Sequence, residues 1–131
     1  MERVMERLRV ARQALSTLQE LTNKPELSLV ERDAAIQRFE YTFEAAWKAA
    51  RMFVSEIEGL TANSPKGVVR ACWQSGLLDE TNAQTALRMC AARNMTVQTY
   101  NEKLAASIYR QIEGYADLLD MWLRAMELHA A

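Results

Sequence analysis

Apolar residues recur at every third or fourth position over most of this chain, which is the spacing of one face of an α-helix. The first 21 residues show the pattern clearly, with mostly charged and amide side chains between the apolar positions Val4, Leu8, Ala11, Leu15 and Leu18. The pattern predicts an amphipathic helix with one buried face over residues 1–21. We expect this helix to end before Pro25, because a proline disfavours helical backbone in the residue that precedes it.

A second, longer helix is predicted to begin at Ser28. Ser28 and Glu31 have the spacing of a capping box, in which each side chain accepts a hydrogen bond from an open amide of the other residue. The apolar stripe then continues to Gly59 without a helix breaker, through Ile36, Phe39, Phe43, Trp47, Ala50, Val54 and Ile57. A stripe of this length and aromatic content needs a partner helix of similar length to cover it.

Three further helices are predicted in the second half of the chain. Ser64-Pro65 provides an N-cap and a first helical residue for a short helix that ends at Gly76. Asp79 can cap a fourth helix that closes at Arg93-Asn94, and residues 95–99 interrupt the helical pattern. The last helix is predicted from about Asn101, with apolar positions at Leu104, Ile108, Ile112, Tyr115, Leu119, Trp122 and Met126.

These elements predict an all-α fold. No stretch alternates apolar and polar residues as a half-buried strand would, and four glycines with two prolines in 131 residues are few for a turn-rich β sandwich. Three long and two shorter helices around one core indicate an up-and-down four-helix-type bundle with one or two additional short helices. We expect residues 1–131 to form a single helical-bundle domain, since no repeat or low-complexity segment divides them.

The charge balance excludes a protein whose overall field attracts nucleic acid. Sixteen basic and seventeen acidic residues give a net charge of -1, so any nucleotide contact must be local, and RNA is not expected as a partner. The N-terminal segment is charged from its second residue, and no apolar run approaches the length of a membrane span. We therefore expect a cytoplasmic protein without a membrane partner.

Most general catalytic and metal-binding arrangements are missing. The chain has no phosphate-binding glycine loop and no nucleophile elbow. Cys72 and Cys90 are eighteen positions apart, and with one histidine in the chain they predict no zinc site and are expected to be free buried thiols, although a disulfide is not excluded. That histidine, His129, lies two residues from the C-terminal end, where a general base is poorly held. No metal ligand is predicted.

One face of the second helix carries Glu40, Glu44 and Lys48 at successive turns. Two carboxylates one turn apart could bind a metal or share a proton, but the Glu44–Lys48 spacing is also that of an ordinary helical ion pair, which is the favoured interpretation. Glu44 is the more interesting of the two acids, because it lies beside the stripe that contains Phe43 and Trp47.

The segment 93–100 places polar residues between two apolar helices. An arginine at a helix junction, here Arg93, can clamp a phosphate with two parallel hydrogen bonds. The alternative is that Arg93 and Asn94 only cap a helix and that a polar bend follows.

Three blocks of this sequence resemble the nucleotidyltransferase substrate-binding proteins of the HEPN superfamily. They are RFEYTFEAAWKA at 38–49, SPKGVVR at 64–70 and RNMTVQTY at 93–100, in the family's order and spacing. The resemblance implies a four- to five-helix bundle, usually a homodimer, like the C-terminal domain of kanamycin nucleotidyltransferase. It also implies a separately encoded minimal nucleotidyltransferase as partner, often in a toxin–antitoxin couple. The partner is expected to use a nucleoside triphosphate with magnesium, and this chain needs no cofactor of its own.

Active members of the superfamily are ribonucleases with an Arg-x4-His-x-Tyr motif, and the match is incomplete here. Arg93 and Tyr100 take the places of the arginine and the tyrosine, but Gln98 stands where the histidine should be. Glutamine donates and accepts hydrogen bonds but does not transfer protons near neutral pH. In some members the partner adenylylates the motif tyrosine, which makes Tyr100 a candidate acceptor.

The sequence therefore predicts a non-catalytic subunit that binds a nucleotide or phosphate and pairs with a nucleotidyltransferase. The predicted pocket is lined by Arg93, Asn94, Gln98 and Tyr100, with Glu44 across from them. A degenerate HEPN endoribonuclease toxin is the alternative, and a bundle that serves association alone is a third interpretation.

Overall fold

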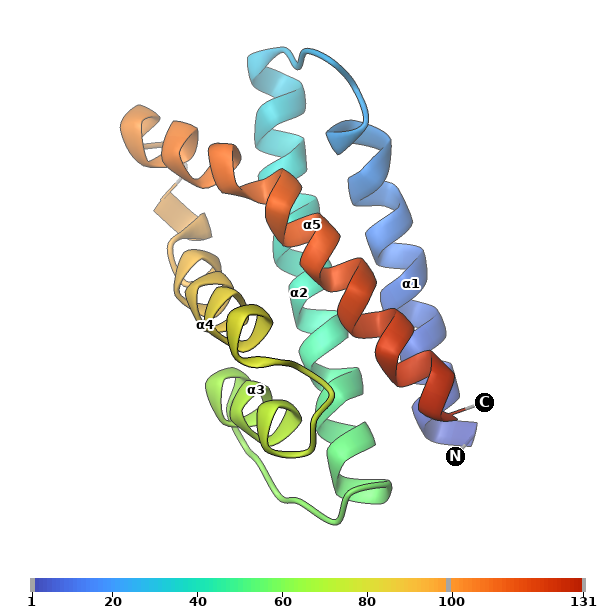
Figure 1. Ribbon diagram of the computed structural model, residues 1–131. Coiled ribbons are helices and arrows are strands. Elements are labelled where there is room, and N and C mark those ends of the chain that lie inside the picture. The colour runs from blue at the N-terminus through green and yellow to red at the C-terminus, as the bar shows by residue number, and fades with distance from the viewer. Residues whose placement is uncertain (1, 99, 131) are drawn as a thin grey trace.

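The computed structural model describes residues 2–98 and 100–130 of the chain, and they form helices joined by short loops (Figure 1). The helices are α1 (Glu2–Thr22), α2 (Leu29–Glu56), α3 (Pro65–Gln74), α4 (Glu80–Arg93), the 3₁₀ turn η1 (Thr96–Gln98) and α5 (Glu102–Ala130). No strand occurs in these two ranges. The predicted all-α fold is confirmed.

The three long helices form the body of the bundle. Helices α1 and α2 run antiparallel, and α5 crosses obliquely over both, so that the start of α1 and the end of α5 lie at the same end of the molecule (Figure 1). Helices α3 and α4 pack against each other on one side of α2. Within the two described ranges, no helix is both long and apolar enough to cross a membrane.

The helix starts follow from local capping chemistry. The Ser28 hydroxyl accepts a hydrogen bond from the Glu31 amide at 3.1 Å, and the Glu31 carboxylate accepts one from the Ser28 amide at 3.0 Å, which confirms the capping box. The side chains of Ser64, Asp79 and Asn101 each accept a hydrogen bond from the amide three residues later, at 3.0, 2.8 and 3.1 Å. These bonds satisfy amides that have no partner inside the helix.

A glycine in the left-handed conformation ends α3. Gly76 has φ +86°, and after it the Leu77 amide donates to the Cys72 carbonyl at 2.9 Å. This is the Schellman arrangement, and it closes α3 at Gln74. The second helix is shorter than predicted: α2 ends at Glu56, and Gly59, with φ +68°, lies in the loop beyond it.

The predicted apolar stripes form a single core between the helices. All five stripe residues of α1 are at most 1 % exposed, and Phe39 and Phe43 of α2 are fully buried. The Phe39 ring stacks on Tyr115 of α5 with centroids 5.6 Å apart, which joins the two longest helices. Ile57 and Leu104 are exceptions, because each lies at a helix end and is only partly buried.

Two arginines tie the long helices together at their polar edges. Arg12 of α1 pairs with Asp120 and with Glu127 of α5, the latter at 2.7 Å. Arg32 of α2 is 9 % exposed and contacts both carboxylate oxygens of Glu102, at 2.6 and 3.1 Å. Together these pairs fix both halves of α5 relative to the α1–α2 hairpin.

Candidate functional site

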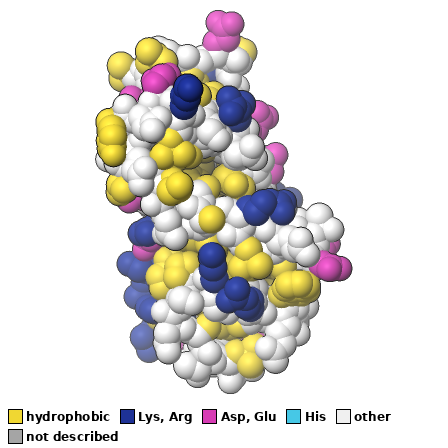
Figure 2. All heavy atoms as spheres, turned by 90° about the vertical axis from the view of Figure 1, so that its left-hand side faces the viewer, with side chains coloured by type: hydrophobic (Ala, Val, Ile, Leu, Met, Phe, Trp, Pro, Cys, Tyr) yellow, Lys and Arg dark blue, Asp and Glu magenta, His cyan; other side chains and the backbone are white. Residues whose placement is uncertain are grey.

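A cavity of about 480 Å³ opens where α2, the start of α3 and the end of α4 meet. Its walls come from three segments that are well separated in the sequence: Glu44 and Trp47; Ser64, Pro65 and Lys66; and Cys90, Arg93 and Asn94. Figure 2 shows the side of the molecule that carries α3 and α4, where basic side chains surround exposed hydrophobic ones and acidic side chains are mainly peripheral. We refer to this hollow as the Arg93 cavity.

Glu44 is the hub of polar contacts in the Arg93 cavity. One of its carboxylate oxygens forms an ion pair with the Arg93 guanidinium. The other accepts a hydrogen bond from Trp47 Nε1 at 3.2 Å and lies 3.9 Å from Lys48 Nζ. Because both oxygens are engaged, the Glu44 side chain is held in one orientation. Its negative charge offsets the positive charge of Arg93.

Arg93 keeps unused hydrogen-bonding capacity. Its Nε atom is buried, and among the described residues no hydrogen-bond acceptor reaches it. Its Nη1 atom donates only a long bond, 3.4 Å, to the Asn94 side-chain oxygen. A buried N–H without an acceptor costs free energy, and an oxygen that reached this atom would remove that cost.

Thr96 fixes the turn that follows α4, and it was not singled out by the sequence. Its side chain is buried, and its hydroxyl lies 2.8 Å from the Arg93 carbonyl and 3.0 Å from a Glu40 carboxylate oxygen. One hydroxyl shared between these acceptors ties the end of α4 to α2. Glu40 thus has a structural partner and does not line the Arg93 cavity.

The structure brings together only part of the predicted pocket. Glu44, Arg93 and Asn94 line one cavity, but Gln98 and Tyr100 are not among its lining residues. The Gln98 amide donates to the Met95 carbonyl at 3.1 Å, within the 3₁₀ turn that follows α4. Gln98 is therefore partly buried in the turn, whereas Tyr100 is 87 % exposed. Thr99, which belongs to the quoted motif, lies outside the described residues.

The remaining cavity residues were not predicted individually. Trp47 was assigned to the core, and it is indeed 8 % exposed, but its indole N–H faces Glu44. The sequence signal for this contact was the spacing of three residues between Glu44 and Trp47, because residues three apart share a helix face. Lys66 is an exposed second cation in the lining. It lies there because the Ser64-Pro65 helix start, which immediately precedes it, also lines the cavity.

No candidate metal ligand set or imidazole lies in the cavity. The described residues contain no cluster of three or more histidine, cysteine, aspartate or glutamate side chains suited to a metal ion. His129 contacts Phe53 near the end of α5, with ring centroids 6.3 Å apart, and does not line the Arg93 cavity.

Both cysteines are expected to be unreactive in the folded protein. Cys72 and Cys90 are free, and burial raises the pKa of each thiol to about 11. At pH 8 roughly one thiol in a thousand is then ionised. We expect a disulfide reagent such as dithionitrobenzoate to react slowly with the native protein and rapidly with both thiols in denaturant. Fast labelling of the native protein at either position would contradict this burial.

Residues 6–128, nearly the whole chain, match the family described as nucleotidyltransferase substrate binding protein like. The chain belongs to this family. The resemblance seen in the sequence blocks is thereby confirmed. No curated protein matches the chain.

Solved structures give the same fold for similar proteins. A crystal structure from Thermus thermophilus is 51 % identical, covers 88 % of this chain and 98 % of its own, and has a TM-score of 0.86. A Haemophilus influenzae structure, described as revealing the fold of a substrate binding domain of a nucleotidyltransferase, is 21 % identical with a TM-score of 0.76 over 92 % and 98 % of the two chains. A tri-AMPylated HEPN toxin of Shewanella oneidensis in complex with MNT antitoxin is 12 % identical, with a TM-score of 0.77 over 95 % and 96 %.

In this member of the family, the Arg93 cavity combines one partly buried ion pair with one unsatisfied arginine donor. Such a site can hold a small anion through hydrogen bonds, but its lining has no imidazole to accept or deliver a proton. The arrangement is suited to binding.

Proposed function

We propose that this chain is a non-catalytic nucleotide- or phosphate-binding subunit that pairs with a separately encoded minimal nucleotidyltransferase. The observation that carries the proposal is the Arg93 side chain, which lines a cavity of about 480 Å³ and whose buried Nε lacks an acceptor among the described residues. A phosphate oxygen supplies the missing acceptor, and the exposed Lys66 on the same cavity adds a second positive charge. The family to which the chain belongs supports a substrate-binding role.

The cavity favours the phosphate of a ligand over its base. Trp47 is the aromatic side chain in the cavity lining, but its ring already has the Arg51 guanidinium 5.1 Å from its centroid. Its indole N–H is also committed to Glu44. A stacked base would therefore have to displace Arg51, whereas a phosphate needs only the free donor of Arg93.

The absence of an imidazole from the lining of this site supports a non-catalytic role. General acid–base catalysis contributes about 10²–10⁴-fold to such reactions, and it requires a group that titrates near the working pH. Gln98 replaces the histidine of the ribonuclease motif, and the chain's own histidine lies against Phe53. An endoribonuclease built on Arg93 alone would lack this contribution, so bond-forming chemistry is assigned to the partner.

We further propose that the partner modifies Tyr100 and that the couple is of toxin–antitoxin type. The Shewanella oneidensis protein of the same fold is described as tri-AMPylated and in complex with an antitoxin. Tyr100 here is 87 % exposed and follows directly on the turn after α4, so its hydroxyl is open to another protein's active site. A homodimer is part of the same proposal.

An intact-mass measurement tests the partnership and the acceptor together. We expect this chain, incubated with a minimal nucleotidyltransferase from the same genome, ATP and magnesium, to gain the mass of one or more adenylyl groups. The gain should disappear in Tyr100→Phe and remain in Tyr41→Phe, which removes the hydroxyl of another exposed tyrosine, on α2, where it is hydrogen-bonded to the Thr17 hydroxyl. A stable complex without a mass gain would retain the binding role and remove the acceptor. If neither a complex nor a mass gain is observed, the partner is removed from the proposal.

A further inference from the structure

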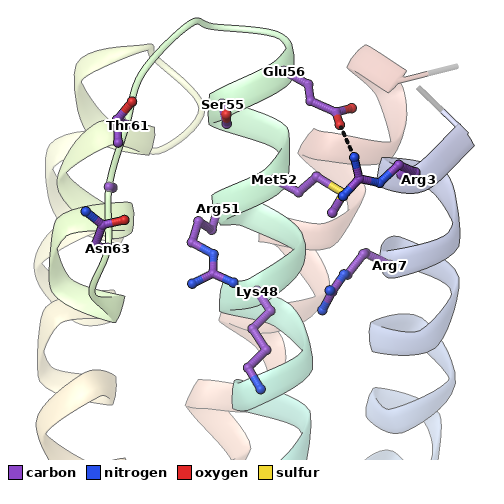
Figure 3. A pocket seen from close by; sticks show the side chains of 10 residues that line it. Arg3, Arg7, Lys48, Arg51, Met52, Ser55, Glu56, Thr61 and Asn63 are labelled. Carbon is purple, nitrogen blue, oxygen red and sulfur yellow. Dashed lines mark ion pairs between the residues drawn. The ribbon is translucent and has the colours of Figure 1, made fainter.

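A second cavity, of about 280 Å³, lies between the start of α1, the last turns of α2 and the loop 57–64 (Figure 3). Its cationic residues are Arg3 and Arg7 from α1 and Lys48 and Arg51 from α2. Figure 3 shows these side chains extending from the two helices around the same hollow, with Thr61 and Asn63 on the loop opposite. We refer to this hollow as the basic cavity.

The basic cavity concentrates positive charge in a chain whose net charge is -1. Its lining contains four cations and a single carboxylate, Glu56. Arg3 and Arg7 lie one helical turn apart, as do Lys48 and Arg51, and like charges at these spacings repel each other. The fold thus brings together two unfavourable pairs whose residues are 41 or more positions apart in the sequence. The repulsion is relieved if an anion binds between them.

Internal compensation of these cations is weak. The Arg3 guanidinium is 3.9 Å from Glu56, and Lys48 Nζ is 3.9 Å from Glu44, whose carboxylate already pairs with Arg93. Arg51 has the Trp47 ring near its guanidinium at 5.1 Å. In the described part of the chain, no carboxylate lies within ion-pair distance of Arg7. Arg7 and Arg51 are therefore charged groups that remain available to a ligand.

The shape and donor set of the basic cavity identify the class of ligand. Arginine forks bind phosphate oxygens with two parallel hydrogen bonds, and three such side chains line one hollow here. The hydroxyls of Ser55 and Thr61 and the amide of Asn63 add neutral donors at the same hollow. The site is concave and small, which suits several linked phosphate groups better than the extended surface of a protein or a nucleic-acid strand.

We propose that the basic cavity binds the oligophosphate chain of a small ligand, supplied either as inorganic triphosphate or as a nucleoside triphosphate. The proposal does not depend on the function assigned to the Arg93 cavity, because the two linings have no residue in common. The two cavities differ in charge balance: Arg93 is paired with Glu44, whereas four cations and one carboxylate line the basic cavity.

Calorimetric titration with inorganic triphosphate, and in parallel with ATP and with adenosine, tests this proposal on the full chain. Arg7→Gln should weaken triphosphate binding by about tenfold, since it removes one charge-assisted contact without breaking an internal pair. Arg110→Gln is the matched control, because Arg110 is an exposed arginine on α5 outside the cavity lining. It should change the affinity by less than about twofold. Adenosine should not bind.

The two triphosphates distinguish the sources of the ligand. Equal affinities for inorganic triphosphate and ATP would assign the site to the phosphates alone, and tighter ATP binding that is lost in Arg7→Gln would assign it to a nucleotide. Arg93→Ala, run alongside, should leave the Arg7-dependent binding in place. The proposal is overturned if Arg7→Gln and Arg110→Gln weaken binding equally, if only Arg93→Ala does so, or if a single-stranded RNA binds while neither triphosphate does.

Discussion

Phe39→Ala is expected to lower the free energy of unfolding by about 3–5 kcal/mol, measured by urea denaturation followed by circular dichroism. Phe39 is fully buried near the centre of α2. Its ring contacts Phe43 within the helix and stacks on Tyr115 of α5, so its removal leaves a cavity at the junction of the two longest helices. The loss is large because the surrounding side chains collapse only partially into such a cavity.

Val30→Ala is the matched control for this experiment. Val30 belongs to the first turn of the same helix and is 79 % exposed, so its truncation should change stability by less than about 0.5 kcal/mol. If Phe39→Ala were as mild as Val30→Ala, the helix α2 would not be packed in the middle of the bundle as described.

Glu44→Gln is expected to strengthen binding of AMP at the Arg93 cavity by about tenfold, which corresponds to about 1.4 kcal/mol. In the native protein the Glu44 carboxylate pairs with the Arg93 guanidinium and repels a phosphate that approaches it. Glutamine keeps an oxygen that can accept the Trp47 Nε1 hydrogen bond but removes the negative charge. Arg93 then becomes the main cationic donor for the ligand. Isothermal titration calorimetry measures the change.

Two further variants make this result specific. Arg93→Ala should abolish the gain and weaken binding below that of the native protein, because the unsatisfied Nε donor is removed. Glu113→Gln changes the net charge equally at an exposed position of α5 and should leave the affinity within about twofold. A loss of affinity in Glu44→Gln would instead mean that Glu44 contacts the ligand directly, as the sequence-based assignment of a binding role to this residue predicts.

The positions of the helices were largely predictable because they depend on neighbours in the sequence. A capping side chain satisfies an amide three residues away, as Ser28, Asp79 and Asn101 do, and the apolar period identifies the face that must be covered. The error at the end of α2 has the same local origin. Gly59 was taken as the closing residue, whereas the helix already ends at Glu56 and Gly59 lies in the loop that follows.

The composition of the Arg93 cavity was predictable only in part. The resemblance to the family motif suggested that Gln98 and Tyr100 would accompany Arg93, but neither lines the cavity, and the buried Thr96 hydroxyl ties the turn to α2. The ion pair between Arg93 and Glu44, 49 positions apart, depends on how α4 packs on α2.

Residue order was enough to locate the helix starts and the apolar faces, to show that a proton-transferring residue is missing at position 98, and to indicate the family. Which polar side chains meet became clear only from the packed helices. Packing placed Glu44 against Arg93, left Tyr100 outside the lining of their cavity, and gathered four cations from α1 and α2 around one hollow. Capping and helical periodicity act within a few residues, whereas the pairing of charges on different helices depends on the packing of the whole core.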